Sequence, residues 1–407
     1  MGGYKFLMRY YHVSDDIRLP ASGISESDRP EDAAPFSIPS CSTRTTQRIK
    51  SKLFATMSTT HLKVAASVSI GVQLIPGGFI PLDEKIAALA QAGFEGIDVY
   101  MWDLIPYTEQ SFNCKLSVRD VFDFNFTEGD WKLLFQAAER VHTLCTSHGL
   151  QVVSAVALFE AEGWPKGSEQ ATTARENLRQ WSLLMKVMGT NMLVVAANAS
   201  PSAQTNLDSV AEDLGELADI LQSSGQRIAF EFVCWSTAAP TWSTAWEVVR
   251  KANRPNLGLC IDTFHIAAVE WADPTTASGQ LEEPNVVANF SMSLKRLTEA
   301  VSPDKIFSVQ LGDAYKLPSP AEPEKLKWPP RLYWAAAWRT KPSIGGGFLP
   351  VDQVTDAILK TGFVGPISIE TFDGGKDGQT PPAGSAVEQA KLLSESWDKS
   401  VPARPEL

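Results

Sequence analysis

The sequence predicts a single (β/α)8 TIM barrel, and three observations point to that α/β fold. Eight short apolar runs alternate with eight longer segments of helical period, a pattern typical of parallel α/β domains. Several of the runs are apolar throughout, as strands covered on both faces are. The 407 residues, 44% of them hydrophobic, are enough for one barrel, since such domains commonly run to about 250 residues or more.

Each predicted strand is short, and a predicted helix follows it. The strands cover residues 66–74, 96–100, 150–157, 191–197, 227–233, 257–262, 305–311 and 365–370. The helices cover residues 83–92, 128–148, 172–188, 205–224, 241–252, 286–301, 351–361 and 386–398. Gly93, Gly149 and Gly189 stand where the first three helices end, a position that favours glycine. An open doubly wound sheet is the alternative, but no GxGxxG motif follows the first strand.

The N-terminal region differs from the rest of the chain. Residues 1–60 are polar, contain several prolines and show no sustained hydrophobic period. A segment that cannot bury apolar surface stays disordered, so a disordered extension is one interpretation. The other is that the gene start is assigned too early, because Met57 lies just before the first strand. The barrel domain is therefore predicted over residues 64–400.

Composition excludes several classes of partner. The formal net charge is −11 and the sequence pI is about 5.1, which disfavours binding to nucleic acid or to an anionic membrane surface. No apolar stretch approaches the roughly 20 residues that span a bilayer. The five cysteines are scattered and form no CxxC pair, so we expect neither a disulfide framework nor a structural zinc site. A reducing, cytoplasmic location is expected.

Polar side chains are rare in the predicted strands, and four of them lie at or near the ends of the last four strands. They are Glu231, Asp262, Gln310 and Glu370. The carboxyl ends of barrel strands converge on one rim, where active sites lie. Buried carboxylates are costly unless paired or bound to a cation, and all-oxygen donors suit Mg2+, Mn2+ or Co2+. The alternative is that each makes an unrelated salt bridge or helix cap.

Two further residues are candidates for catalysis. His265 follows Asp262 by three residues and faces the same rim, where an imidazole suits proton transfer near neutral pH; the alternative is a structural histidine. Arg339 lies in the long connection after the seventh strand, and connections of such length often form active-site lids. Its guanidinium can make paired hydrogen bonds to a carboxylate or phosphate; the alternative is a solvated basic loop.

The motifs resemble the xylose isomerase-like barrel superfamily, and within it the metal-dependent 3-dehydroshikimate dehydratases. The likeness is strongest in LCIDTFHIAAVEWADP, DKIFSVQLGDA and TGFVGPISIETF. The resemblance implies that Glu231, Asp262, Gln310 and Glu370 are metal ligands, that His265 is the catalytic histidine and that Arg339 binds substrate. Gln310 matches the dehydratases, since sugar isomerases and epimerases usually have histidine at that ligand. The sequence departs from the pattern at Phe159, where the dehydratases carry an arginine, and at Ala335, where serine is common.

The resemblance implies a lyase that converts 3-dehydroshikimate to protocatechuate and water. Its partner would be a small carbonyl compound, a cyclic hydroxy-ketone acid, with neither nucleic acid nor membrane involved. An isomerase or epimerase on the same metal site is the second interpretation, in which Glu231 and Glu370 carry the protons. The third is an inactive barrel that acts as a binding protein. The sequence leaves the oligomeric state open, homo-oligomers included.

Overall fold

The computed structural model describes residues 61–71, 77–118 and 126–402. The extension predicted over residues 1–60 lies outside the described residues, so the division into an extension and a barrel stays a prediction. Within the described residues, no helix has both the length and the apolar character needed to cross a membrane.

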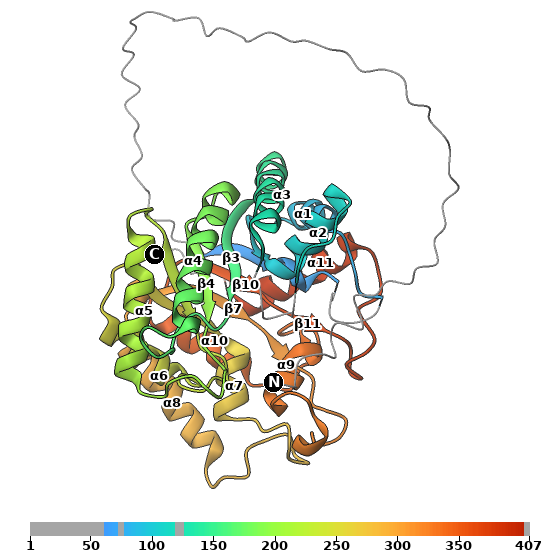
Figure 1. Cartoon of the computed structure of the whole chain (residues 1–407). Coiled ribbons are helices and arrows are strands. Elements are labelled where there is room, and N and C mark those ends of the chain that lie inside the picture. The colour runs from blue at the N-terminus through green and yellow to red at the C-terminus, as the bar shows by residue number, and fades with distance from the viewer. Residues whose placement is uncertain (1–60, 72–76, 119–125, 403–407) are drawn as a thin grey trace, which may run out of the picture.

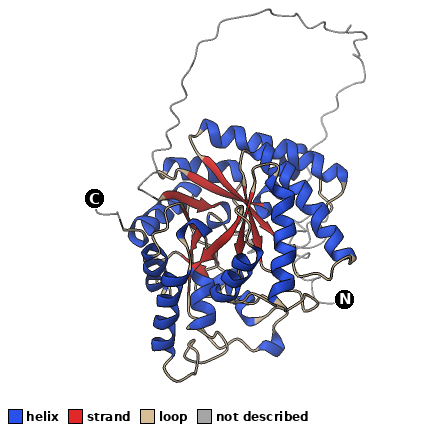
Figure 2. Ribbon diagram, turned by 90° about the vertical axis from the view of Figure 1, so that its left-hand side faces the viewer, coloured by secondary structure: helices blue, strands red, loops and turns tan. Residues whose placement is uncertain are grey.

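Eight parallel strands form a closed barrel surrounded by helices (Figure 1). Their order around the barrel is β1-β10-β7-β6-β5-β4-β3-β2. Figure 2 shows the strands gathered at the centre with helices around them. The barrel strands are β1 (Leu62–Ala66), β2 (Gly96–Tyr100), β3 (Gln151–Leu158), β4 (Met192–Ala196), β5 (Arg227–Glu231), β6 (Leu257–Asp262), β7 (Ile306–Leu311) and β10 (Pro366–Ile369). The closed barrel confirms the predicted fold and rules out the open sheet.

The eight predicted helices are all present, with ends that differ by a few residues. They are α1 (Leu82–Gln91), α3 (Glu128–Ser147), α4 (Glu169–Met188), α5 (Leu207–Gln222), α6 (Trp242–Ala252), α8 (Val286–Ala300), α10 (Val351–Lys360) and α11 (Ala386–Ser400). Three further helices were not predicted, namely α2 (Met101–Phe112), α7 (Thr263–Glu270) and α9 (Pro330–Trp338). All three follow or overlie the ends of barrel strands and so shape the mouth of the barrel.

Local sequence explains where individual elements begin and end. Thr127 and Asp130 form a capping box that starts α3, in which each side chain accepts a hydrogen bond from the other residue's backbone N–H. Gly189 ends α4 with a φ of 77°, a conformation that glycine adopts at no steric cost. In β5, Ile228, Ala229 and Phe230 are fully buried, because the barrel interior covers one face of the strand and helices cover the other.

The first strand was predicted too late in the chain. The structure places it at Leu62–Ala66, and a 3-10 turn follows at Ser67–Ser69. Ser67 accepts a hydrogen bond from the backbone N–H of Tyr100 at 3.1 Å. Ser69 donates to the carbonyl of Ile369 at 3.0 Å. These contacts with neighbouring strands bend the chain where the apolar pattern alone indicates a continuing strand.

A small three-stranded sheet extends the barrel at its mouth. It consists of β8 (Asp313–Ala314), β9 (Arg339–Thr340) and β11 (Phe372–Asp373) in the order β11-β9-β8. Strands β8 and β11 continue the chain beyond β7 and β10, and β9 pairs antiparallel with both. The backbone of Arg339 lies opposite Phe372 on one side and Ala314 on the other. The sheet therefore fixes Arg339 directly above the ends of the last strands.

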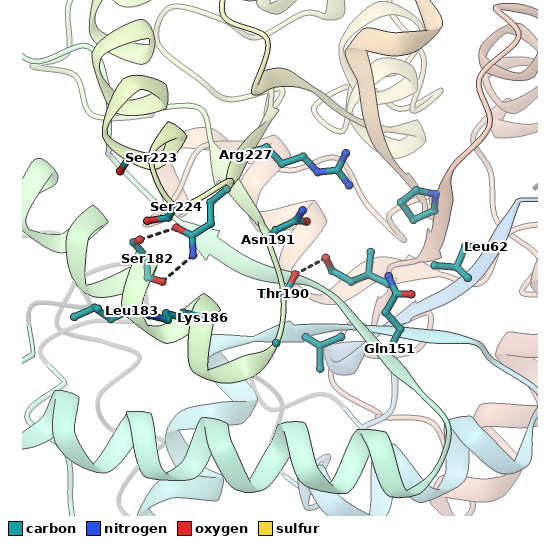
Figure 3. Close-up of a pocket in the computed structure, with 15 residues that line it drawn as sticks. Leu62, Gln151, Ser182, Leu183, Lys186, Thr190, Asn191, Ser223, Ser224 and Arg227 are labelled. Atoms are coloured by element: carbon teal, nitrogen blue, oxygen red, sulfur yellow. Dashed lines mark hydrogen bonds between the residues drawn. The ribbon is translucent and has the colours of Figure 1, made fainter. Parts of the chain in front are cut away.

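The opposite end of the barrel, where the strands begin, holds a pocket of about 750 Å³ (Figure 3). Its lining includes Gln151, Arg227 and Pro366, which open three of the strands. Ser182 and Thr190 in its wall hydrogen-bond to other residues of the same wall. Among the described residues that line this pocket, none is acidic.

Candidate active site

The structure brings all six candidate residues together at the carboxyl ends of the barrel strands. Glu231 ends β5, Asp262 ends β6, Gln310 is the penultimate residue of β7, and Glu370 follows β10 directly. His265 lies in the first turn of α7, and Arg339 opens β9. The side chains of all six residues are buried.

Three of these residues form a compact group. Glu231, Asp262 and His265 each offer one ligand atom, and the three atoms lie within 4.8 Å of one another. The distance from His265 Nε2 to Glu231 Oε1 is 3.5 Å, and to Asp262 Oδ2 it is 3.8 Å. Asp262 also caps α7, because its Oδ1 accepts the backbone N–H of Phe264 at 2.7 Å. The cap fixes the start of the helix that carries His265, so that the imidazole is held beside the two carboxylates.

The contacts of the His265 ring define which of its nitrogens is available. Nδ1 lies 3.4 Å from the backbone nitrogen of Cys234 and 3.5 Å from its Sγ. These contacts allow two tautomers, in which Nδ1 either accepts the backbone N–H or donates to the sulfur. Nε2 faces the carboxylates and the cavity in both cases. Burial lowers the pKa of His265 to about 4 although Asp262 opposes the change, so the ring is neutral at physiological pH.

Gln310 and Glu370 form a second, hydrogen-bonded group. Gln310 Nε2 donates to Glu370 Oε1 at 2.8 Å and to the Tyr100 hydroxyl at 3.2 Å. Its Oε1 accepts from the Cys260 thiol at 3.1 Å. Gln310 is therefore held on both sides of its amide, and it orients the Glu370 carboxylate.

Arg339 connects the two groups. Its Nη2 donates to Asp262 Oδ2 at 2.5 Å, and its Nη1 donates to Glu370 Oε2. The guanidinium carbon lies 5.0 Å from the ring centre of Phe264 and 5.4 Å from that of Phe372. Arg339 is only 2% exposed, so the alternative of a solvated basic loop is wrong. The residue was expected in a lid that closes over a ligand, but here it is paired with two of the predicted metal ligands.

Because Gly312 has no side chain, there is room beside it for the guanidinium of Arg339. A Cβ at this position would lie 2.3 Å from Arg339 Nη2 and 2.8 Å from the carbonyl oxygen of Glu370. Real side-chain carbons do not approach other atoms so closely, so any other residue would displace Arg339 or the backbone.

The electrostatics of the mouth favour a cation. Burial raises the pKa of Glu231 to about 7, and it also raises that of Asp262, which Arg339 partly counteracts. Asp98 in β2 lies below them, and burial raises its pKa to about 6. Glu231, Asp262 and Glu370 lie near the Arg339 guanidinium, and Asp98 lies near Glu231 and Glu370. An oxygen-rich, electron-rich set of this kind fits a divalent cation.

A small cavity of about 70 Å³ opens beside these groups. Glu231, His265, Arg339 and Glu370 line one side of it. The remaining wall is mostly aromatic and aliphatic and includes Tyr100, Trp102, Phe159, Trp235, Trp328, Leu332, Ala335 and Phe372. The wall of the cavity thus combines a few polar groups with flat apolar faces, a composition that small-molecule sites share.

Phe159 lies in that apolar wall. Its ring stacks on Trp102 with the ring centres 5.9 Å apart and an angle of 20° between the planes. The position where the dehydratase pattern has an arginine is therefore part of an aromatic pair that faces the cavity.

Three residues in and below the mouth were not predicted from the sequence. Asp98 accepts a hydrogen bond from Ser154 Oγ at 2.5 Å inside the barrel, and a carboxylate within the apolar run GIDVY could have identified it. Tyr100 ends the same strand and hydrogen-bonds to Gln310. Trp235 packs against the His265 ring with centres 5.0 Å apart; it follows β5 in a loop, and nothing in the sequence distinguishes it.

Comparison with known proteins places this site in a family. The model of the xylose isomerase-like TIM barrel family matches residues 86–396. A 3-dehydroshikimate dehydratase of Neurospora crassa is 31% identical over 303 residues, which cover 72% of this chain and 81% of that protein. A 3-dehydroshikimate dehydratase of Pseudomonas aeruginosa is 27% identical over 72% of this chain, but the match covers only 36% of that longer protein.

A short sequence match and a structural alignment point to other barrels of this kind. An inosose isomerase of Bacillus subtilis is 42% identical over 57 residues, or 14% of this chain. Among solved structures, a fusion of a xylose isomerase-like TIM barrel with 4-hydroxyphenylpyruvate dioxygenase aligns with a TM-score of 0.60 and 22% identity, covering 83% of this chain and 42% of that one. Since the family model spans most of the barrel, the chain belongs to the xylose isomerase-like TIM barrel family.

Proposed function

We propose that this protein is a divalent-metal-dependent lyase that dehydrates 3-dehydroshikimate to protocatechuate. One observation carries the proposal: buried acids, a neutral histidine and an arginine converge on one cavity, in a chain 31% identical to a fungal 3-dehydroshikimate dehydratase. The reaction removes one hydrogen and one hydroxyl from the substrate ring, so it balances as protocatechuate plus one water.

Glu231, Asp262, Gln310 and Glu370 are the residues that would hold the cation. Mg2+, Mn2+ and Co2+ are the candidates, because the donors are oxygen atoms. A cation bound there supplies Lewis acidity, which lowers the cost of negative charge on a ketone oxygen.

His265 carries the proton transfers in this proposal. In the tautomer whose Nδ1–H points at Cys234 Sγ, Nε2 is free to take a proton from the carbon next to the ketone. The resulting imidazolium then donates the same proton to the departing hydroxyl, which leaves as water. Glu231 and Asp262 lie close to Nε2 and stabilise the imidazolium while it exists.

The walls of the cavity hold the ring and keep water away. Trp102, Phe159 and Phe372 present apolar surface, which favours a flat ring and the aromatic product. Among the described residues that line the cavity, Arg339 is the only one with a permanent positive charge. It is therefore the cationic group in this wall that can pair with the substrate carboxylate, in competition with Asp262 and Glu370.

The test is an assay of purified protein on 3-dehydroshikimate with each of the three cations, following the ultraviolet absorbance of protocatechuate. We expect product with at least one cation and none after treatment with a chelator. Protein that is correctly folded but gives no product with any of these cations contradicts the proposal.

An isomerase or epimerase is the second candidate function. It is supported by the cavity position of both Glu231 and Glu370 and by the short match to an inosose isomerase. Glu370 is already bound by Gln310 and Arg339, which leaves it poorly placed to shuttle protons. Incubation with inosose in deuterated water distinguishes the two: an isomerase incorporates deuterium, whereas a dehydratase leaves this substrate unchanged.

A further inference from the structure

Arg339 occupies an unusual place for a residue that binds substrate. Both of its terminal nitrogens are used by carboxylates of the protein, Asp262 and Glu370. Nη2 also approaches the backbone carbonyl of Glu370 at 3.2 Å. Three of its five N–H groups are engaged in this way, which leaves fewer donors for the carboxylate of a ligand.

The two carboxylates that Arg339 holds are also two of the four candidate metal ligands. Removing a buried cation leaves the opposing charges uncompensated, which is strongly destabilising. Arg339 supplies one positive charge of that compensation. A divalent cation at the same carboxylates supplies twice the charge and makes the guanidinium redundant there.

The surroundings allow the side chain to leave while its backbone stays in place. Strand β9 pairs with β8 and β11 on its two sides, which fixes the Arg339 backbone. The side chain lines the cavity on its other face, and its Nε has no hydrogen-bond partner within the described part of the chain. Phe264 and Phe372 offer aromatic faces to the guanidinium, and such contacts tolerate sliding better than hydrogen bonds do.

We propose that Arg339 is a displaceable internal cation that couples metal binding to recognition of the substrate carboxylate. Without metal, its guanidinium pairs with both Asp262 and Glu370 and offsets one of their two negative charges. A divalent cation takes over these two carboxylates, and the released guanidinium then binds the carboxylate of a ligand in the cavity. The proposal rests on the proposed function for two expectations, that Asp262 and Glu370 bind a divalent cation and that the substrate is a carboxylic acid.

Coupling of this kind is reciprocal, so each ligand strengthens the binding of the other. The metal-free protein binds carboxylates weakly because Arg339 is already engaged. The metal-bound protein binds them more tightly, and the gain depends on the negative charge of the ligand. A ring of the same shape without charge gains nothing from Arg339.

The experiment uses calorimetry on the full-length protein with Mn2+, benzoate and benzamide as separate probes. Benzoate and benzamide share a ring, but only benzoate carries the charge, and neither has the catechol oxygens of protocatechuate. We expect Mn2+ to strengthen benzoate binding about tenfold, within the usual range of such coupling, and to leave benzamide binding unchanged. Equal benzoate affinity with and without Mn2+ overturns the proposal.

The variant Arg339→Gln tests the residue itself. It lacks the competing cation, so we expect it to bind Mn2+ at least as tightly as the wild type and to lose the Mn2+-dependent gain for benzoate. A matched control is Arg331→Gln, since Arg331 lies on α9 and, among the described residues, donates to the backbone carbonyls of Ala268 and Ala272 and not to a carboxylate. This control is expected to keep the gain. Weaker Mn2+ binding in Arg339→Gln overturns the proposal.

A second measurement covers the case in which Arg339→Gln does not fold. Wild-type protein with 15N-labelled arginine is titrated with Mg2+, and the guanidinium resonances are followed by NMR. We expect one buried guanidinium, slow to exchange in metal-free protein, to shift and lose protection when Mg2+ binds. Resonances unchanged at saturating Mg2+ contradict displacement.

The outcomes separate this inference from the proposed function. If the protein dehydrates 3-dehydroshikimate but shows no coupling between Mn2+ and benzoate, the proposed function stands and the role of Arg339 as a displaceable cation is wrong. If the protein shows the coupling but forms no protocatechuate, the role of Arg339 stands and the proposed substrate is wrong.

Discussion

The two ends of the barrel differ in size and in charge. The pocket where the strands begin has a volume of about 750 Å³, whereas the cavity where they end has only about 70 Å³. The larger pocket is lined by neutral polar and aliphatic residues with Lys186 and Arg227, and by no acid among its described residues. The smaller cavity has two buried glutamates, a histidine and an arginine in its wall.

The larger volume therefore does not mark the reactive end of this barrel. Polar groups at the strand starts satisfy one another, as Gln226 and Ser182 do through two hydrogen bonds. At the strand ends, carboxylates are buried in excess over the cations nearby. That excess costs free energy in the folded protein, and binding of a cation recovers it. The predictions below test whether function depends on this end alone.

The largest effect is expected for Glu231→Gln. The change keeps the shape of the side chain but removes one negative charge from the group with Asp262 and His265. We expect the variant to lose Mn2+ binding, measured by elemental analysis after gel filtration, and to form no detectable protocatechuate. Lys186→Gln at the other end is the matched control and should retain both. Full turnover by Glu231→Gln would falsify the assignment of the metal site.

The next largest effect is expected for His265→Asn. Loss of a positioned acid or base typically slows a reaction by about 10²–10⁴-fold, so kcat should fall by that factor. Mn2+ binding should stay close to that of the wild type, because the oxygen donors remain. If the variant loses Mn2+ as well, His265 is a metal ligand instead of the proton carrier, as its place in the compact group with Glu231 and Asp262 allows.

Asp98→Asn should change how stability depends on pH. Burial raises the pKa of Asp98 in the folded protein to about 6, above its usual value. The protonated form therefore stabilises the fold below about pH 4, and this contribution is lost as pH rises to about 6, at a total cost of about 2–3 kcal/mol. The free energy of unfolding, measured with denaturant on metal-free protein, should differ less between pH 4 and pH 7 in the variant than in the wild type. Asp356, which forms an exposed ion pair with Lys360, provides the control. Asp356→Asn should keep the wild-type difference in unfolding free energy between the two pH values.

The smallest effect is expected for Arg227→Gln in the large pocket. The guanidinium carbon lies 5.0 Å from the ring centre of Phe307, and such a contact contributes about 0.5–1 kcal/mol. The midpoint of thermal unfolding should fall by a few degrees at most, while kcat and KM stay unchanged. A marked loss of turnover would show that the strand-start end also takes part in function.

The sequence predicted the barrel and most of its elements because their causes are local. Hydrophobic period, glycine at helix ends and apolar strands are all visible within a few residues. The error in the first strand arose because Ser67 and Ser69 bend the chain through bonds to Tyr100 and Ile369. Helix α9 was missed although Pro329 and Pro330 mark its start, a common position for proline.

The sequence predicted which strand ends carry the site residues, but not the hydrogen bonds that join their side chains. The convergence of Glu231, Asp262, Gln310 and Glu370 follows from the parallel barrel, in which strand ends share one rim. The bond between Arg339 and Asp262 joins residues 77 positions apart, and it depends on the small sheet that carries β9. No local pattern encodes that sheet, so the sequence placed Arg339 in a lid and not between two acids.

Gly312 has a consequence for attempts to redesign this protein. Because a Cβ there would lie 2.8 Å from the backbone carbonyl oxygen of Glu370 as well as 2.3 Å from Arg339 Nη2, any other residue at position 312 requires a shift of the backbone and not only of the guanidinium. A directed-evolution library for new substrates should hold 312 as glycine and randomise Phe159 and Trp235, whose side chains border the cavity without bonding to the acids.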